Sequence, residues 1–231
     1  MPLSTGRPQT SPPARARTGR RLALAAAGLV LVFWFTLRPP FVVRPLTSPP
    51  LPGSAAPPVQ SAAARFVDGI WTNQVLPTVR EKAQPIEKIL PEIRSDPDVA
   101  GQTYGRREAT NPYNYLVKGT GQVTELHTGS QAGTAMVEVP NLPEKVALQI
   151  GPVIRGTALR DATGLVSFNQ FTNQLDYADV SKEMNGRALK AAFGRLEPGS
   201  LVGKTITFFG AFTFDRHAKP PVLITPVAID L

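Results

Sequence analysis

Short stretches of alternating apolar and polar residues dominate the C-terminal half of the chain and predict β-strands. Five such stretches follow one another, at 113–126, 133–139, 146–154, 205–214 and 222–231. Between the third and the fourth, apolar positions at helical spacing over 176–196 predict one helix. Gly119 and Gly121 interrupt the first stretch and indicate a bulge or a sharp bend in that strand.

The order of these elements is strand, strand, strand, helix, strand, strand, which is the order of the OB-fold. A glycine-bent first strand suits such a barrel, because that strand curls through both halves of the sheet. We therefore expect residues 113–231 to form a mainly β, α+β domain, an OB-like small barrel with one helix between strands 3 and 4. Other small barrels with one helix share this order, so the pattern does not single out one fold.

Residues 61–112 predict short broken helices that lead into the barrel. Ser61 is a good N-cap, and Phe66 and Ile70 begin an apolar stripe at a spacing of four residues. Prolines interrupt the helical pattern afterwards, because a proline inside a helix removes a backbone donor and clashes with the preceding turn. They are Pro77, Pro85 and Pro91.

An uncharged apolar run at 22–37 follows a basic segment at 1–21, which together predict an export signal. A helix of this length reaches about 24 Å, short of a hydrocarbon core of about 30 Å. No small-residue cleavage site follows closely, so we prefer an uncleaved signal anchor in the inner membrane to a cleaved signal peptide. Residues 38–60 form a proline-rich linker, and the rest of the chain is expected in the periplasm or another extracytoplasmic space.

The net charge of +8 belongs to the N-terminal segment and not to the predicted barrel. Residues 1–50 hold seven arginines and no acidic residue, which leaves 18 basic against 17 acidic residues afterwards. A nearly neutral domain argues against a nucleic-acid partner. The chain has no cysteine and two histidines, which excludes thiolate chemistry and gives no metal-binding spacing. We expect no metal and no cofactor.

A dense polar stretch at 151–177 is the candidate ligand-binding region. Arginine, amide and aromatic side chains together suit a small polar ligand. The candidate residues are Arg155, Thr157, Arg160, Asp161, Asn169, Asn173 and Tyr177. The structural alternative, which we prefer, is that an Arg160–Asp161 ion pair and backbone-bonding asparagines stabilise a long connection.

Several stretches resemble the predicted periplasmic lipoproteins known as domain of unknown function 2291. The matching pieces include YGRRE (104–108), VKGTGQV (117–123), GPVIRGTALRD (151–161), FNQFTNQLDYADV (168–180) and GKTITFFGAFTF (203–214). The resemblance covers about residues 64–230. It implies an exported, membrane-tethered domain whose gene tends to lie beside those of sugar ABC transporters. Members commonly carry a lipobox cysteine that this sequence lacks, so the run at 22–37 would be the tether.

Several functions fit these observations. We prefer a tethered accessory or binding domain that contacts a small polar ligand or a sugar ABC transporter component, and we expect no catalytic residues. One alternative is a periplasmic carbohydrate-acting enzyme that uses Asp161, Asp176 or Asp179 as paired carboxylates. Another is a purely structural subunit of an envelope complex. The Arg106–Glu108 charge cluster is interpreted as a solvated turn.

Overall fold

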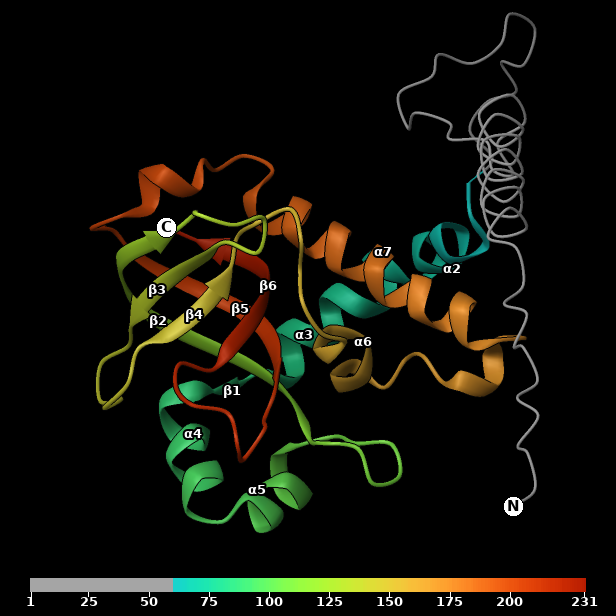
Figure 1. Cartoon of the computed structure of the whole chain (residues 1–231), viewed down its shortest axis with the longest axis horizontal. Coiled ribbons are helices and arrows are strands. Elements are labelled where there is room, and N and C mark those ends of the chain that lie inside the picture. Colours follow the sequence, from blue (N-terminus) through green and yellow to red (C-terminus); the bar gives the residue numbers. More distant parts are fainter. Residues whose placement is uncertain (1–59) are drawn as a thin grey trace, which may run out of the picture. The chain divides into compact units, whose positions relative to one another are not determined.

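The computed structural model describes residues 60–231, which contain a closed five-stranded barrel (Figure 1). Its strands are β2 (Asn114–His127), β3 (Thr134–Glu138), β4 (Val146–Gln149), β5 (Thr205–Thr213) and β6 (Leu223–Asp230). They are joined in the order β2-β3-β4-β6-β5, and β5 pairs again with β2 to close the barrel. The β4–β6 pair is parallel and the other barrel pairs are antiparallel, which is the OB-fold arrangement.

The long strand β2 takes part in both halves of the barrel, as the glycines predicted. Its first part, Asn114–Gln122, pairs with β5, and its second part, Gln122–His127, pairs with β3. A Cβ atom at Gly119 would lie 2.7 Å from the Phe208 ring. At Gly121 it would meet the Glu138 carbonyl oxygen across the sheet. Both positions need glycine because neighbouring atoms approach the backbone closely where the strand bends.

The barrel interior forms the first hydrophobic core, which helix α4 (Ile86–Ser95) extends at one end of the barrel. Every second residue of β2 and β5 points inward, including Tyr115, Val117 and Phe208. Four apolar side chains of α4 are buried against them, although Pro91 lies inside the helix. They are Ile86, Ile89, Leu90 and Ile93. The two-residue strand β1 (Gln84–Pro85) pairs in parallel with β2 and positions this helix.

A second hydrophobic core lies on the outer face of β5 and β6. It is formed by α2 (Ala62–Ile70), the π-helical segment Trp71–Val75, α3 (Leu76–Lys82), α6 (Ala158–Thr163) and the long α7 (Gln174–Phe193). Leu116 and Ala211 belong to this core, because side chains on a strand alternate between its two faces. Arg187 on α7 binds Asp68 on α2 at 2.6 Å and Glu183 on its own helix at 3.1 Å.

Two expectations need correction in the connection between β4 and β5. It holds two α-helices, α6 and α7, where the sequence predicted one. The third strand ends at Gln149 rather than 154, because the chain turns away from β4 at Gly151 and Pro152. The 3-10 helices Phe168–Gln170 and Pro198–Leu201 flank α7.

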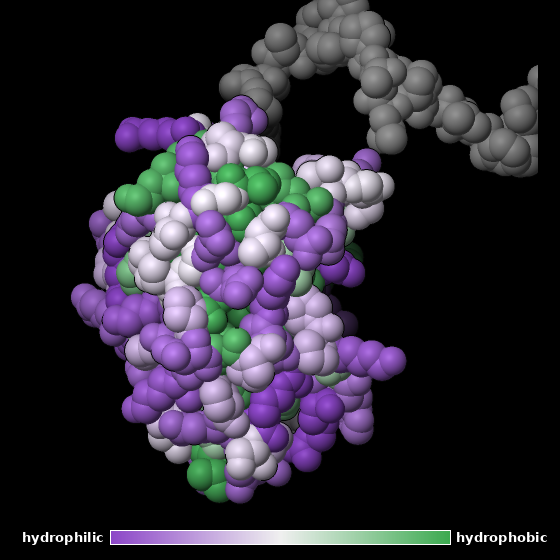
Figure 2. Space-filling model, turned by 90° about the vertical axis from the view of Figure 1, so that its left-hand side faces the viewer, coloured by the Kyte–Doolittle hydropathy of each residue, from purple (hydrophilic) through white to green (hydrophobic). Residues whose placement is uncertain are grey.

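The surface of the barrel side is mainly hydrophilic, with small hydrophobic clusters (Figure 2). Among residues 60–231, no helix has the length and apolar character needed to cross a membrane. The predicted signal anchor at 22–37, its basic flank and most of the proline-rich linker lie outside the described residues.

Candidate functional site

Four of the seven candidate residues meet where α6 faces the start of α7. The buried Arg160 guanidinium donates to Asp161 Oδ1 at 2.7 Å and to the Tyr177 carbonyl oxygen at 3.1 Å. It also lies over the Tyr177 ring, 3.6 Å from the centroid. Thr157 donates its hydroxyl to the other Asp161 oxygen at 2.6 Å. The geometry favours the structural alternative, because Arg160 is satisfied by groups of the protein itself.

Tyr177 links this cluster to Glu108, which precedes β2 by six residues. Its hydroxyl donates to Glu108 Oε2 at 3.4 Å. Burial raises the pKa of Tyr177, the Asp161 and Glu108 charges raise it further, and the Arg160 charge opposes them. Glu108 is exposed at a bend, as the interpretation as a solvated turn expected, and its carboxylate also has a partner on α7.

The other three candidate residues have separate surroundings. Asn173 is the N-cap of α7 and accepts from the Asp176 amide at 2.9 Å. Asn169 is exposed on a 3-10 helix. The backbone of Arg155 is held by Gln149, through bonds of 2.7 and 3.1 Å, and Arg155 borders a shallow hollow on the outer face of β3 and β4. The seven candidate residues thus form one cluster and three separate positions and do not line one pocket.

A small polar hollow lies beside the Arg160 cluster. Asp161 and Tyr177 border it on one side, and the Arg106–Glu108 segment borders it on the other. Gly164 ends α6 in the left-handed conformation, at a φ of 66°. A side chain there would meet the Arg106 guanidinium. Glycine at this position therefore lets Arg106 lie against the end of α6.

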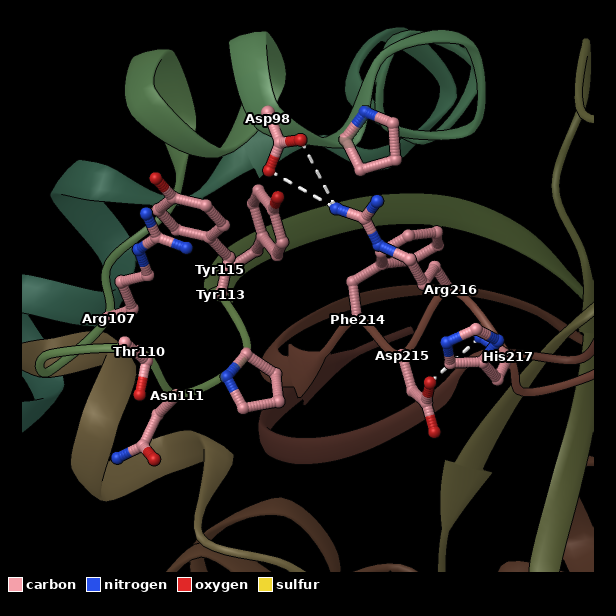
Figure 3. Close-up of a pocket in the computed structure, with 12 residues that line it drawn as sticks. Asp98, Arg107, Thr110, Asn111, Tyr113, Tyr115, Phe214, Asp215, Arg216 and His217 are labelled. Atoms are coloured by element: carbon pink, nitrogen blue, oxygen red, sulfur yellow. Dashed lines mark hydrogen bonds and ion pairs between the residues drawn. The ribbon is translucent and has the colours of Figure 1, made fainter.

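A larger pocket of about 260 Å³ lies on the other side of Arg107 (Figure 3). Its walls come from the start of α5 (Pro97–Tyr104), the loop at 107–113, the start of β2, and the segment that follows β5. Asp96 caps α5 by accepting from the amides of Asp98 and Val99, which fixes the helix start at the pocket edge. Segments more than 100 positions apart in the sequence therefore form one site.

Tyr115 is the most deeply buried side chain of this pocket. It has 0% exposure, stacks on Phe212 at 5.2 Å, and its ring extends from β2 towards Asp98 (Figure 3). Its hydroxyl has no hydrogen-bond partner among the described residues. Burial raises the pKa of Tyr115 to about 12, and the nearby Tyr113 and Asp98 add to the effect. The hydroxyl is therefore neutral and able to donate at ordinary pH.

Two arginines line the pocket around this hydroxyl, and among the described residues only one of them is paired with a carboxylate. Arg216, after β5, binds Asp98 at 3.2 Å across the pocket. Arg107 lies over the Tyr113 ring, 4.2 Å from its centroid, and has no ion-pair partner within residues 60–231. Asp215, on the opposite side of the pocket from Arg107, accepts from the His217 amide at 2.8 Å (Figure 3).

Sequence reasoning missed this pocket for a definable reason. Tyr115 has the periodicity of a core residue, which it also is, and no pattern marks its hydroxyl as unpaired. The available signal was the pair Arg106–Arg107, six residues before the predicted strand at 113–126. In the described part of the chain, no cluster of histidine and carboxylate side chains has the geometry to hold a metal ion.

The family model for the predicted periplasmic lipoproteins (DUF2291) matches residues 43–230. The chain belongs to this family. Its description indicates a periplasmic, membrane-associated protein, although this DUF2291 sequence contains no cysteine that could carry a lipid. The match spans both hydrophobic cores and the pocket of Figure 3.

A solved structure supports the fold of this DUF2291 protein. An OB-fold protein from Thermotoga maritima superposes with a TM-score of 0.60 and 18% sequence identity, over 74% of this chain and 98% of that one. At this identity the likeness establishes the fold and carries no functional assignment. No protein with a curated description matches the sequence.

Proposed function

We propose that this DUF2291 protein is a membrane-tethered, extracytoplasmic accessory domain that binds a small carbohydrate in the pocket of Figure 3. The tether is the apolar run at 22–37, and the partner is a component of a sugar ABC transporter. The unpaired Tyr115 hydroxyl carries the proposal, because a buried polar group without a partner is rare and marks a place where a ligand can pair with it.

The other walls of the pocket fit a polyhydroxylated ligand. Sugar hydroxyls both donate and accept, so they pair with guanidinium, amide and carboxylate groups together. Arg107, Asn111 and Asp98 supply these groups, and Phe214 adds an aromatic surface for the apolar face of a sugar ring. A volume of about 260 Å³ suits a monosaccharide better than a large ligand.

The carboxylates of the enzymatic alternative are engaged elsewhere. Asp161 binds Arg160, Asp176 accepts a hydrogen bond from the Asn173 side-chain amide, and Asp179 binds Lys182 at 2.8 Å. Glycoside hydrolysis needs two carboxylates that flank the scissile bond, one of them free to donate a proton. These engagements support a binding role without catalysis.

The test is calorimetric titration of the full chain in detergent with neutral monosaccharides such as glucose, galactose and ribose. Thr110 is exposed on the pocket wall, so Thr110→Trp should fill the pocket and abolish binding. Thr172→Trp, at an exposed position outside the pocket, is the matched control and should bind normally. Binding that persists in Thr110→Trp, or no binding of any sugar, would overturn the proposal.

The transporter partner needs a separate experiment. Affinity purification of the anchored full chain from solubilised membranes should recover a permease or a sugar-binding protein. Recovery of envelope proteins unrelated to transport would favour the structural-subunit alternative instead.

A further inference from the structure

On the side of Arg107, the pocket of Figure 3 holds hydrogen-bond donors that have no partner among the described residues. Tyr115 presents a hydroxyl with no partner among the described residues. Arg107 lies over the Tyr113 ring, 4.2 Å from its centroid, and its N–H groups have no hydrogen-bond partner in the described part of the chain. Thr110 and Asn111 stand on the same wall. A ligand must therefore bring acceptors to this side.

The carboxylates of the pocket already accept hydrogen bonds from protein groups, which use part of their acceptor capacity. Asp98 receives both of its contacts from Arg216, at 3.2 and 3.3 Å. Asp215 accepts from the backbone of its own loop, and Glu108, next to Arg107 in the chain, accepts from Tyr177. The charge of Arg107 thus has no counterion among the described residues, while the other arginine of the pocket has one.

We propose that the pocket selects an anionic monosaccharide, with the carboxylate or phosphate on Arg107 and a ring or hydroxyl oxygen on the Tyr115 hydroxyl. This inference rests on the proposed function, since it specifies the class of sugar that the same pocket binds. The planar guanidinium can hold an anion through two parallel N–H bonds, and its contact with the Tyr113 ring holds it beside the pocket.

Glucuronate and glucose form the decisive ligand pair, because they share their hydroxyl pattern and differ by one carboxylate. By titration calorimetry of the full chain, glucuronate should bind at least about tenfold more tightly than glucose. Arg107→Ala should remove this preference, and Arg107→Lys should keep part of it through charge alone. Glucose 6-phosphate tests phosphate, while acetate and inorganic phosphate test the anion without a sugar.

The outcomes separate the two proposals. If glucose binds and Thr110→Trp abolishes its binding, the pocket is a sugar site. Equal affinities for glucose and glucuronate, or a preference that survives Arg107→Ala, would then overturn the proposed selection of anions. The proposal of a sugar site would still stand. If acetate or inorganic phosphate binds as tightly as glucuronate, the site recognises an anion only and the inference is overturned. If no sugar binds, both proposals are wrong.

Discussion

Replacing Tyr115 with phenylalanine removes one oxygen atom from the pocket and keeps the ring that packs in the barrel core. A buried polar group without a partner costs about 1–3 kcal/mol. We expect Tyr115→Phe to raise the free energy of unfolding by about 1 kcal/mol, the lower end of this range, because the hydroxyl adjoins a polar hollow. For a domain of this size the melting temperature should rise by about 2–4 °C.

The assay is thermal unfolding followed by circular dichroism without ligand, with Tyr113→Phe as the matched control. Tyr113 directly precedes the same strand and is only partly buried, so its variant should shift the melting temperature by less than about 1 °C. A fall of several degrees in Tyr115→Phe would show that the folded protein uses this hydroxyl in a hydrogen bond. The Tyr115 hydroxyl would then not be an unpaired donor.

The same pair of proteins gives a second measurement above pH 10. The folded state holds the pKa of Tyr115 at about 12, whereas the unfolded chain has the ordinary value near 10. The unfolded state therefore loses its proton first, and stability that is fully present below pH 10 declines as the pH rises towards 12. Wild-type protein should lose stability more steeply in this window than Tyr115→Phe, and parallel curves would contradict the raised pKa.

Glucuronate binding to the Tyr115→Phe variant should weaken about two- to tenfold.

Three further substitutions test the connection between β4 and β5, each by chemical denaturation with two-state analysis. Arg160→Ala leaves the Asp161 carboxylate without its buried partner and should cost about 3 kcal/mol, and a loss below 1 kcal/mol would contradict the buried pair. Asn173→Ala removes the N-cap of α7 and should lower the free energy of unfolding by about 1 kcal/mol. Asn173→Asp should keep most of the stabilisation that the cap provides. Gly164→Ala puts a side chain in a left-handed conformation against Arg106 and should cost at least about 1 kcal/mol; an unchanged midpoint would show that Arg106 moves freely.

The barrel could be predicted from the sequence because its signals are local. Alternation along each strand, the glycine-bent first strand and the helix before the fourth strand each need only a short window of residues. The six-residue helix α6 was missed because a helix of about one and a half turns carries little periodicity. The break at Gly151–Pro152 was predicted to lie inside the third strand, whereas it follows the end of that strand.

The pocket could not be predicted because nothing local connects its parts. Asp98 and Arg216 are 118 positions apart and meet only after β5 has paired with β2. The ligand-binding region was predicted at 151–177 because arginine, aspartate and asparagine residues lie close together there in the sequence. The structure uses most of them to hold α6 and α7 together, which the sequence analysis had preferred as the simpler alternative.

If residues 22–37 tether the chain as proposed, the docking of α2 on α7 determines how a mechanical load on the tether would enter the domain. α2 begins directly after the proline-rich linker, so any pull on the tether reaches it first. Arg187 joins it to α7 through Asp68 and the Ala64 carbonyl oxygen, and the apolar contacts of the second core share the force. The pocket lies among the elements of the first core, on the other side of the barrel wall. A pull on the proposed tether would therefore load this helix pair before it reached the elements around Tyr115.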